Sequence, residues 1–281
     1  MPSRPPWRRP FILIPLYIYP SADSWGPLFS AVMSHPSLDF VTIVNPDNGP
    51  GCTSLPDQNY MKSLRKLSSF SNVTIVGYVY CSYGERALAE MESDIRAYCG
   101  WVSQRSKTPK TTSGYSAHGP DTSLRLDGIF FDEVPSADQH IDYMASASHA
   151  ARMELRRINA ASVVIYNPGI FVGPPLYNHA DFVVVFENAA AEWSSNYVRK
   201  NMARLPETLR GRSIGIAHSL DCVEEQVQFT RDVVSAGFAG HFATTTLGYT
   251  RFCPNWEGYV RHADESGRTA TGESVATLAP G

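Results

Sequence analysis

The chain has 281 residues, a formal net charge of −3 at pH 7 and a sequence pI of about 6.2. Hydrophobic residues make up 43% and charged residues 18%, which is typical of a globular protein that buries a full-sized core. The balance excludes the global basic field that binds nucleic acid or an anionic membrane. Arg4, Arg8 and Arg9 cluster in a Pro-rich stretch, and we interpret residues 1–10 as a solvated tail.

The first apolar run covers residues 11–19 and follows arginines, as the core of a signal sequence does. It contains Pro15, ends at Pro20 and lacks a small-residue cleavage site, so we interpret it as a first β-strand. No apolar run approaches the roughly 18–20 residues of a membrane span. We therefore expect neither a signal sequence nor a membrane anchor within this chain.

Short β-prone runs alternate with helical patterns along the rest of the chain. Helix 138–160 shows the pattern clearly, with Met144, Ala147, Ala151 and Leu155 at helical spacing, and Gly237 is suited to end a later helix. Strands are predicted at 11–18, 40–45, 73–80, 126–132, 162–166, 181–187, 212–218 and 238–243. Helices are predicted at 24–34, 57–69, 85–101, 138–160, 192–204 and 222–236.

Strands that are apolar on both faces and joined by helices predict a parallel sheet covered on both sides. Eight such strands favour an α/β fold of the (β/α)₈ barrel type, with a doubly wound open sheet as the alternative. We expect a single domain over residues 11–260, a long loop at 103–124 and a polar tail at 261–281. The early strands are not followed by a G-x-G-x-x-G or P-loop motif, so no nucleotide partner is expected.

Cysteine and histidine spacing predicts no metal or cofactor. None of the five cysteines belongs to a C-x-x-C pair, and no His/Asp/Glu triplet has the spacing of a metal site. We interpret the cysteines as buried thiols; one or two disulfides remain open if the protein is exported. Asn72 begins an N-glycosylation sequon, which matters only outside the cell.

Polar and aromatic side chains gather where the predicted strands end, which in a barrel is the catalytic face. Aromatic faces stack on sugar rings, while amides and acids bond sugar hydroxyls, so this set predicts a polysaccharide partner. Asn45 also leads into a turn sequence, and His218 has a structural histidine as its alternative interpretation. The predicted substrate-binding residues are Tyr17, Tyr19, Asn45, Tyr78, Tyr80, Asn167 and His218.

The predicted catalytic residues are Asp132, Glu133 and Glu187, because glycoside cleavage needs two carboxyl groups. Successive strand residues face opposite ways, so Asp132 and Glu133 both reach the mouth only if Glu133 has left the regular strand. Capping a helix or pairing with an arginine remains the alternative for the acidic pair, and an ion pair with Arg199 or Lys200 the alternative for Glu187. Sequence spacing does not distinguish a retaining from an inverting enzyme.

Several of these runs together resemble a known family. The motifs are IPLYIYP at 14–20, VNP at 44–46 with GPG at 49–51, GYV at 77–79 with SYG at 82–84, and GIFFDE at 128–133. They are similar to the spherulin-4 family, glycoside hydrolase family 135, over residues 11 to 250. The resemblance implies a (β/α)₈ barrel that cleaves α-1,4-linked N-acetylgalactosamine in a fungal galactosamine-containing exopolysaccharide (galactosaminogalactan). It also implies that Asp132, Glu133 and Glu187 are the essential acids and that the protein is extracellular or at the cell surface.

Two other functions remain open on sequence. A non-catalytic spore or cell-wall protein would bind glycan with the same cleft and release no product. A chitinase-like hydrolase would cut another amino-sugar linkage, but its D-x-x-D-x-D-x-E pattern is absent here. We expect a monomer that acts without nucleic acid.

Overall fold

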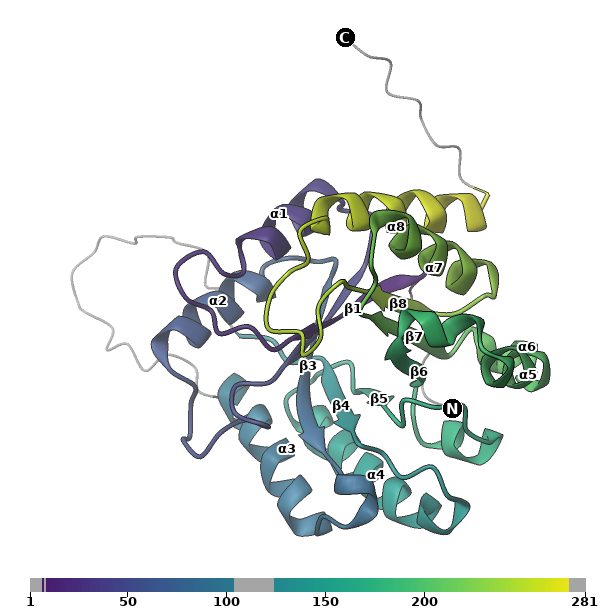
Figure 1. The fold of residues 1–281 in the computed structure, drawn as a ribbon. Helices are drawn as coiled ribbons and strands as arrows, with labels where there is room; N and C mark the ends of the chain where they lie inside the picture. Colours follow the sequence, from purple (N-terminus) through teal and green to yellow (C-terminus); the bar gives the residue numbers. More distant parts are fainter. Residues whose placement is uncertain (1–6, 8, 104–123, 273–281) are drawn as a thin grey trace.

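A computed structural model describes residues 7, 9–103 and 124–272 of the chain. Eight parallel strands close into a barrel in the order in which they occur in the sequence, and helices surround it (Figure 1). The strands are β1 (Phe11–Leu16), β2 (Phe40–Val44), β3 (Val73–Tyr80), β4 (Gly128–Asp132), β5 (Val163–Tyr166), β6 (Phe182–Ala189), β7 (Ser213–His218) and β8 (Gly240–Ala243). The prediction of a single (β/α)₈ domain is confirmed, and the open doubly wound sheet is excluded because β1 pairs with β8.

The main helices are α1 (Gly26–Ser34), α2 (Gln58–Ser68), α3 (Leu88–Ser103), α4 (Ile141–Arg157), α5 (Asn196–Arg204), α6 (Glu207–Arg210), α7 (Val223–Ser235) and α8 (Trp256–Ala270). One-turn helices lie at Ser82–Gly84 (η1), Asp138–His140 (η2), Pro174–Asn178 (η3) and Ala190–Ser194 (η4). Asp57 caps α2 by accepting from the Asn59 and Tyr60 amides, and Gly237 follows α7 with a φ of +79°. In the described part of the chain, none of the helices is long and apolar enough to cross a bilayer.

The predicted tails are partly wrong. The chain from 261 to 270 continues α8, because Tyr259, Val260, Ala263 and Gly267 recur at helical spacing and are buried. At the other end, Trp7 packs its ring 4.5 Å from Phe11. Most of the predicted 103–124 loop lies outside the described residues.

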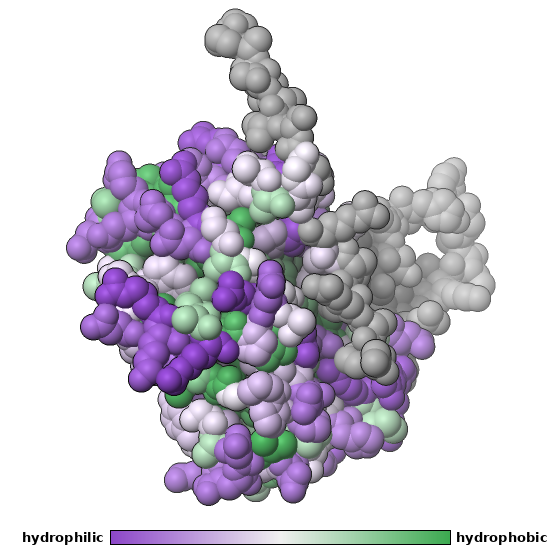
Figure 2. Space-filling model, turned by 90° about the vertical axis from the view of Figure 1, so that its right-hand side faces the viewer, coloured by the Kyte–Doolittle hydropathy of each residue, from purple (hydrophilic) through white to green (hydrophobic). Residues whose placement is uncertain are grey.

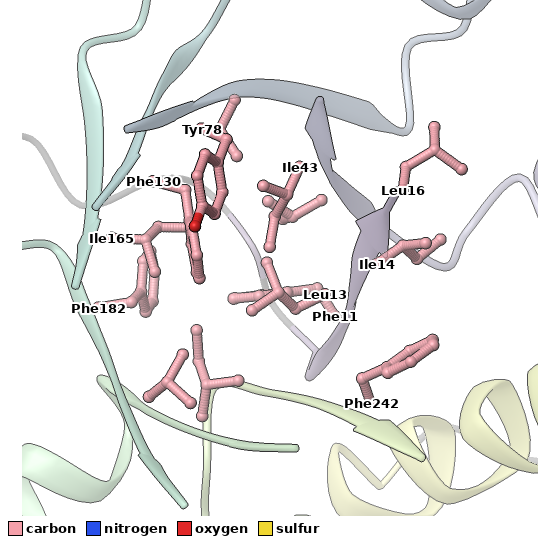
Figure 3. Close-up of a cluster of buried hydrophobic side chains, with 14 of the residues drawn as sticks. Phe11, Leu13, Ile14, Leu16, Ile43, Tyr78, Phe130, Ile165, Phe182 and Phe242 are labelled. Atoms are coloured by element: carbon pink, nitrogen blue, oxygen red, sulfur yellow. The ribbon is translucent and has the colours of Figure 1, made fainter. Parts of the chain in front are cut away.

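The barrel interior is filled by side chains from every strand, so it is a packed core and not a channel. The side chains of Leu13, Ile43, Tyr78, Phe130 and Ile165 point toward a common centre (Figure 3). Figure 2 shows an outer face on which hydrophilic side chains dominate and apolar ones form only small patches. In enzymes with this fold, the reactive groups lie at the end where the strands finish.

Two sequence features would matter in an exported protein: the glycosylation sequon at Asn72 and the cysteines. Asn72 is buried, and its amide donates to the carbonyl oxygens of Val32, His35 and Leu38, each at 3.1 Å. A glycan would replace one of the two hydrogens on this nitrogen and has no room in this buried position, so the sequon is not an accessible site in the folded protein. None of the five cysteines, all within the described residues, forms a disulfide.

Candidate active site

Two of the three predicted catalytic acids lie side by side and share one hydrogen-bond donor. The Asn167 Nδ2 donates to Asp132 Oδ1 at 2.7 Å and to Glu187 Oε2 at 2.5 Å. Two bonds from one nitrogen keep these inner carboxylate oxygens within about 5 Å of each other, and retaining glycosidases hold their two carboxyl groups about 5–5.5 Å apart. The three side chains come from the ends of β4, β5 and β6.

A tyrosine lies on the outer side of each acid. Tyr78 donates to Asp132 Oδ2 at 2.8 Å, and Tyr249 donates to Glu187 Oε1 at 2.7 Å. The ring of Tyr17 lies between these tyrosines, with centroids 5.6 Å from Tyr78 and 6.0 Å from Tyr249. We call Tyr17, Tyr78, Asp132, Asn167, Glu187 and Tyr249 the acid ring.

The acid ring pushes both carboxyl groups toward the protonated form. Burial raises the pKa of Asp132, while hydrogen bonds from Tyr78 and Asn167 oppose the rise. Burial also raises the pKa of Glu187, and the negative charge of Asp132 raises it further. Glu187 therefore has the stronger tendency of the two to hold a proton, because the charge of Asp132 adds to the effect of burial.

Strand geometry explains why Asp132 points into the mouth. Phe130 lies in the barrel interior and its ring stacks on that of Tyr78, 6.3 Å away (Figure 3). Asp132 is two residues further along β4, so it faces the same way. A carboxylate that follows a run of buried residues is thereby placed above the core.

Glu187 reaches the mouth by a different device. The pairing of β6 with β7 shifts between Val184 and Phe186, so that Val185 is an extra residue in the ladder. Before the shift Phe182 faces the interior; after it Phe186 turns outward to contact Trp193 at 5.0 Å, and Glu187 turns inward. Without this bulge, strict alternation would direct Glu187 to the helix layer.

Glu133 lies just outside the regular strand. Because successive strand residues face opposite ways, Asp132 and Glu133 can both reach the mouth only in this way. β4 ends at Asp132, and Glu133 has a φ of +51°. Its carbonyl oxygen accepts from the Tyr83 amide at 2.8 Å. Partial burial and then the charge of Asp132 raise the pKa of Glu133, while the Ser82 amide opposes the rise.

The remaining predicted residues have other contacts. Asn45 Oδ1 accepts from the Gly49 amide at 2.8 Å, which shapes the turn, and Tyr80 packs its ring 3.9 Å from the Arg86 guanidinium. Tyr19 donates to Asp57 at 2.8 Å, and His218 contacts the hydroxyl of its neighbour Ser219. These residues lie around the mouth but outside the acid ring.

The alternative interpretation of Glu187 as an ion-pair partner is not supported: in the described chain neither Arg199 nor Lys200 pairs with it.

Sequence reasoning missed Tyr249, which lies in the loop between β8 and α8 and has a φ of +55°. Strand-end patterns cannot find a loop residue; the turn-forming Gly248 beside it was the only local signal.

A cavity of about 1010 Å³ lies at the opposite end of the barrel, lined in part by Trp7, Phe11, Phe182 and Phe238. It contains none of the predicted site residues, so this cavity and the carboxylate pair lie at different ends of the molecule. The candidate active site is the end that carries the carboxylates. Within the described residues no group of three His, Cys, Asp or Glu side chains is placed to hold a metal ion.

Comparison with known proteins identifies the family of the chain. The profile of the spherulation-specific family 4 matches residues 11–263. The chain belongs to the spherulin-4 family. Spherulin-4 of Physarum polycephalum is 30% identical over 186 residues, which are 66% of this chain and 47% of that protein. The chain thus spans about half the length of this curated relative.

The crystal structure of Aspergillus clavatus Sph3 in complex with GalNAc is similar to this member of the spherulin-4 family, with a TM-score of 0.76 and 26% identity, covering 91% of this chain and 98% of that one. A Rhizomucor miehei chitinase superposes with a TM-score of 0.51 at 8% identity, covering 92% of this chain and all of that one. An endo-1,4-beta-mannanase from the same organism gives 0.51 at 12% identity, covering 95% and 96%. The last two show the shared barrel fold alone.

Proposed function

We propose that this protein is a glycoside hydrolase that cleaves α-1,4-linked N-acetylgalactosamine within a galactosamine-containing polysaccharide. The observation that carries the proposal is the sharing of Asn167 by Asp132 and Glu187, because two carboxyl groups at this separation are the machinery of glycoside cleavage. The sugar is suggested by the similar Aspergillus structure, which is in complex with GalNAc.

We assign the general acid to Glu187 and the nucleophile to Asp132. Glu187 holds the proton of the pair because burial and the charge of Asp132 raise its pKa. It donates this proton to the leaving glycosidic oxygen while Asp132 attacks the anomeric carbon. Water, deprotonated by Glu187, then displaces Asp132 and returns the proton to Glu187, so that the product keeps the α configuration.

The chemistry of the substrate supports an enzyme-borne nucleophile. In an α-linked galactosaminide the acetamido group and the leaving oxygen lie on the same face of the ring. The acetamido oxygen cannot then attack from the opposite face, as it does in substrate-assisted hydrolases. This leaves the attack to a carboxylate, and the hydrogen bonds from Tyr78 and Asn167 stabilise the ionised form of Asp132.

Digestion of a defined N-acetylated α-1,4-galactosamine polymer tests the proposal. Glu187→Gln and Asp132→Asn should each abolish the release of reducing ends while the circular dichroism spectrum stays native. Glu192→Gln is the matched control, because Glu192 is exposed and lies five residues after Glu187. Near-normal activity in either site variant removes that residue from the mechanism.

The same assay separates the competing functions. A glycan-binding wall protein binds the polymer and releases nothing, and a chitinase-like enzyme cuts a β-1,4-N-acetylglucosamine polymer instead. NMR of the first-formed anomer tests retention. A β product at early times would exclude Asp132 as a nucleophile and make it a base for water.

A further inference from the structure

Unusual backbone conformations meet beside the acids. Ser82, Tyr83 and Gly84 follow one another with φ of +47°, +52° and +95°, and Glu133 adjoins them with +51°. Non-glycine residues rarely adopt this region of φ, and strain of this kind persists at functional sites. Four residues in this region of φ, drawn from two loops, therefore need an explanation.

Backbone hydrogen bonds fix this conformation. The Tyr83 amide donates to the Glu133 carbonyl at 2.8 Å, and the Cys81 amide donates to the Asp132 carbonyl at the same distance. The Gly84 amide closes the turn on Cys81 at 3.0 Å. The 81–84 turn is thus tied to the two residues that carry the acids.

Gly84 is required at its position on steric grounds as well. A Cβ atom built there would lie 2.8 Å from His140 Nδ1, so the turn packs closely against η2. This close contact and the backbone bonds make the turn rigid. A rigid turn fixes the direction in which its central side chain leaves the backbone.

That side chain, Tyr83, is exposed although its backbone is held so firmly. It is 65% exposed, and within the described residues neither its ring nor its hydroxyl has a partner. Slight burial and the negative charges of Glu133, Asp132 and Glu187 raise its pKa, which shows that the phenol lies near all three acids. Packing does not explain an aromatic residue here.

We propose that Tyr83 is a sugar-binding residue. Its ring stacks on the sugar unit adjacent to the one whose glycosidic bond is cleaved. The ring lies on the β3–β4 side of the mouth, held by the same turn that positions Glu133. A sugar offers an apolar C–H face to an aromatic ring, and a ring held rigidly loses little entropy on binding it. This inference rests on the proposed glycan-cleaving function and adds a subsite to it.

Steady-state kinetics on α-1,4-linked N-acetylgalactosamine oligosaccharides test the proposal. Tyr83→Ala should raise KM about tenfold with kcat within about twofold of wild type, since loss of one ring contact weakens binding but not chemistry. Alanine keeps a Cβ, so the backbone cost at this φ is unchanged. Tyr83→Phe keeps the ring and should restore KM to near the wild-type value.

Met153→Ala is the control, because Met153 is an exposed apolar side chain (41%) in the middle of α4, away from the mouth. The proposal is overturned if Tyr83→Ala has a wild-type KM, or if Tyr83→Phe loses as much as Tyr83→Ala. Calorimetric binding of the oligosaccharide to Glu187→Gln, with and without Tyr83→Ala, should show the same tenfold difference in Kd.

The binding and cleavage measurements together show which of the two proposals has failed. If the wild type cleaves or binds the oligosaccharide and Tyr83→Ala is indistinguishable from it, only the role of Tyr83 is wrong. If the wild type binds without cleaving, the hydrolase proposal fails while a Tyr83-dependent Kd still supports the subsite. If the wild type neither binds nor cleaves, both proposals are wrong.

Discussion

Asn167 gives the acid ring its geometry. Its single amide nitrogen has two hydrogens, and each goes to a different carboxylate. An amide is neutral, so it holds the acids together without lowering either pKa as far as an arginine would. The Asn167 Oδ1 is buried without a partner among the described residues, an unmet acceptor that is a cost of this placement.

The two tyrosines that donate hydrogen bonds to the acids, Tyr78 and Tyr249, allow the roles of the acids to be assigned from the pH profile. Tyr249 donates to Glu187 and stabilises its ionised form, so Tyr249→Phe should raise the pKa of Glu187. A general acid is lost as pH rises through its pKa. The alkaline limb of the kcat/KM profile should therefore move to higher pH in Tyr249→Phe.

Tyr78→Phe is the matched variant on the other acid. Loss of its bond raises the pKa of Asp132, which must be ionised to attack, so the acid limb should move to higher pH. Both profiles come from initial rates across the pH range. If Tyr249→Phe moved the acid limb and Tyr78→Phe the alkaline limb, the two acids would have the opposite roles. If neither limb moved, neither tyrosine would affect the pKa of its acid.

At the scale of elements, β3 positions the site through a glycine. A Cβ on Gly77 would lie 2.7 Å from the ring of Tyr98 in α3, a buried residue whose hydroxyl donates to the Val44 carbonyl. The helix can approach the strand this closely only because Gly77 has no side chain. Tyr78, the donor to Asp132, is the next residue along the strand.

Gly77→Ala should therefore destabilise the protein by about 1–3 kcal/mol, because the buried ring must shift. Gly100→Ala is the matched control within α3: nothing lies within 4 Å of its Cβ position, and it should gain about 0.5–1 kcal/mol in helix propensity. Urea unfolding measures both. Equal effects at the two positions would contradict the close packing of α3 on β3.

For the whole molecule, closure of the barrel depends on the contact between its first and last strands. β1 and β8 pair only at Phe11↔Gly240 and Ile12↔His241. Phe11 is fully buried there, with its ring 4.5 Å from Trp7 and 5.2 Å from Phe182. This aromatic cluster lies at the end of the barrel opposite the acids, where it lines the cavity.

Phe11→Ala should cost about 3–5 kcal/mol, because it leaves a large cavity at the seam. Met33→Ala, an exposed change on α1, should stay within about 0.5 kcal/mol of wild type. Unfolding followed by circular dichroism and by tryptophan fluorescence should give coincident transitions. A small loss, or separate transitions, would show that the barrel does not depend on this seam.

The sequence by itself determined the eight strands, because each is a run apolar on both faces and only a parallel sheet buries both faces. It also indicated that Asp132 and Glu187 follow buried runs, where an ionised carboxylate costs free energy unless other groups bond or neutralise it. It did not reveal α8, whose polar residues conceal a buried face at Tyr259, Val260 and Ala263.

Only the tertiary structure decided how the acids meet. Strict alternation in the sequence directs Glu187 away from the mouth, and the bulge at Val185 that reverses it depends on pairing with β7. Tyr249 reaches Glu187 across 62 positions of the chain. Contacts of this kind depend on barrel closure, which brings the loop after β8 over the end of β6. No local sequence pattern predicts a contact between residues so far apart in the chain.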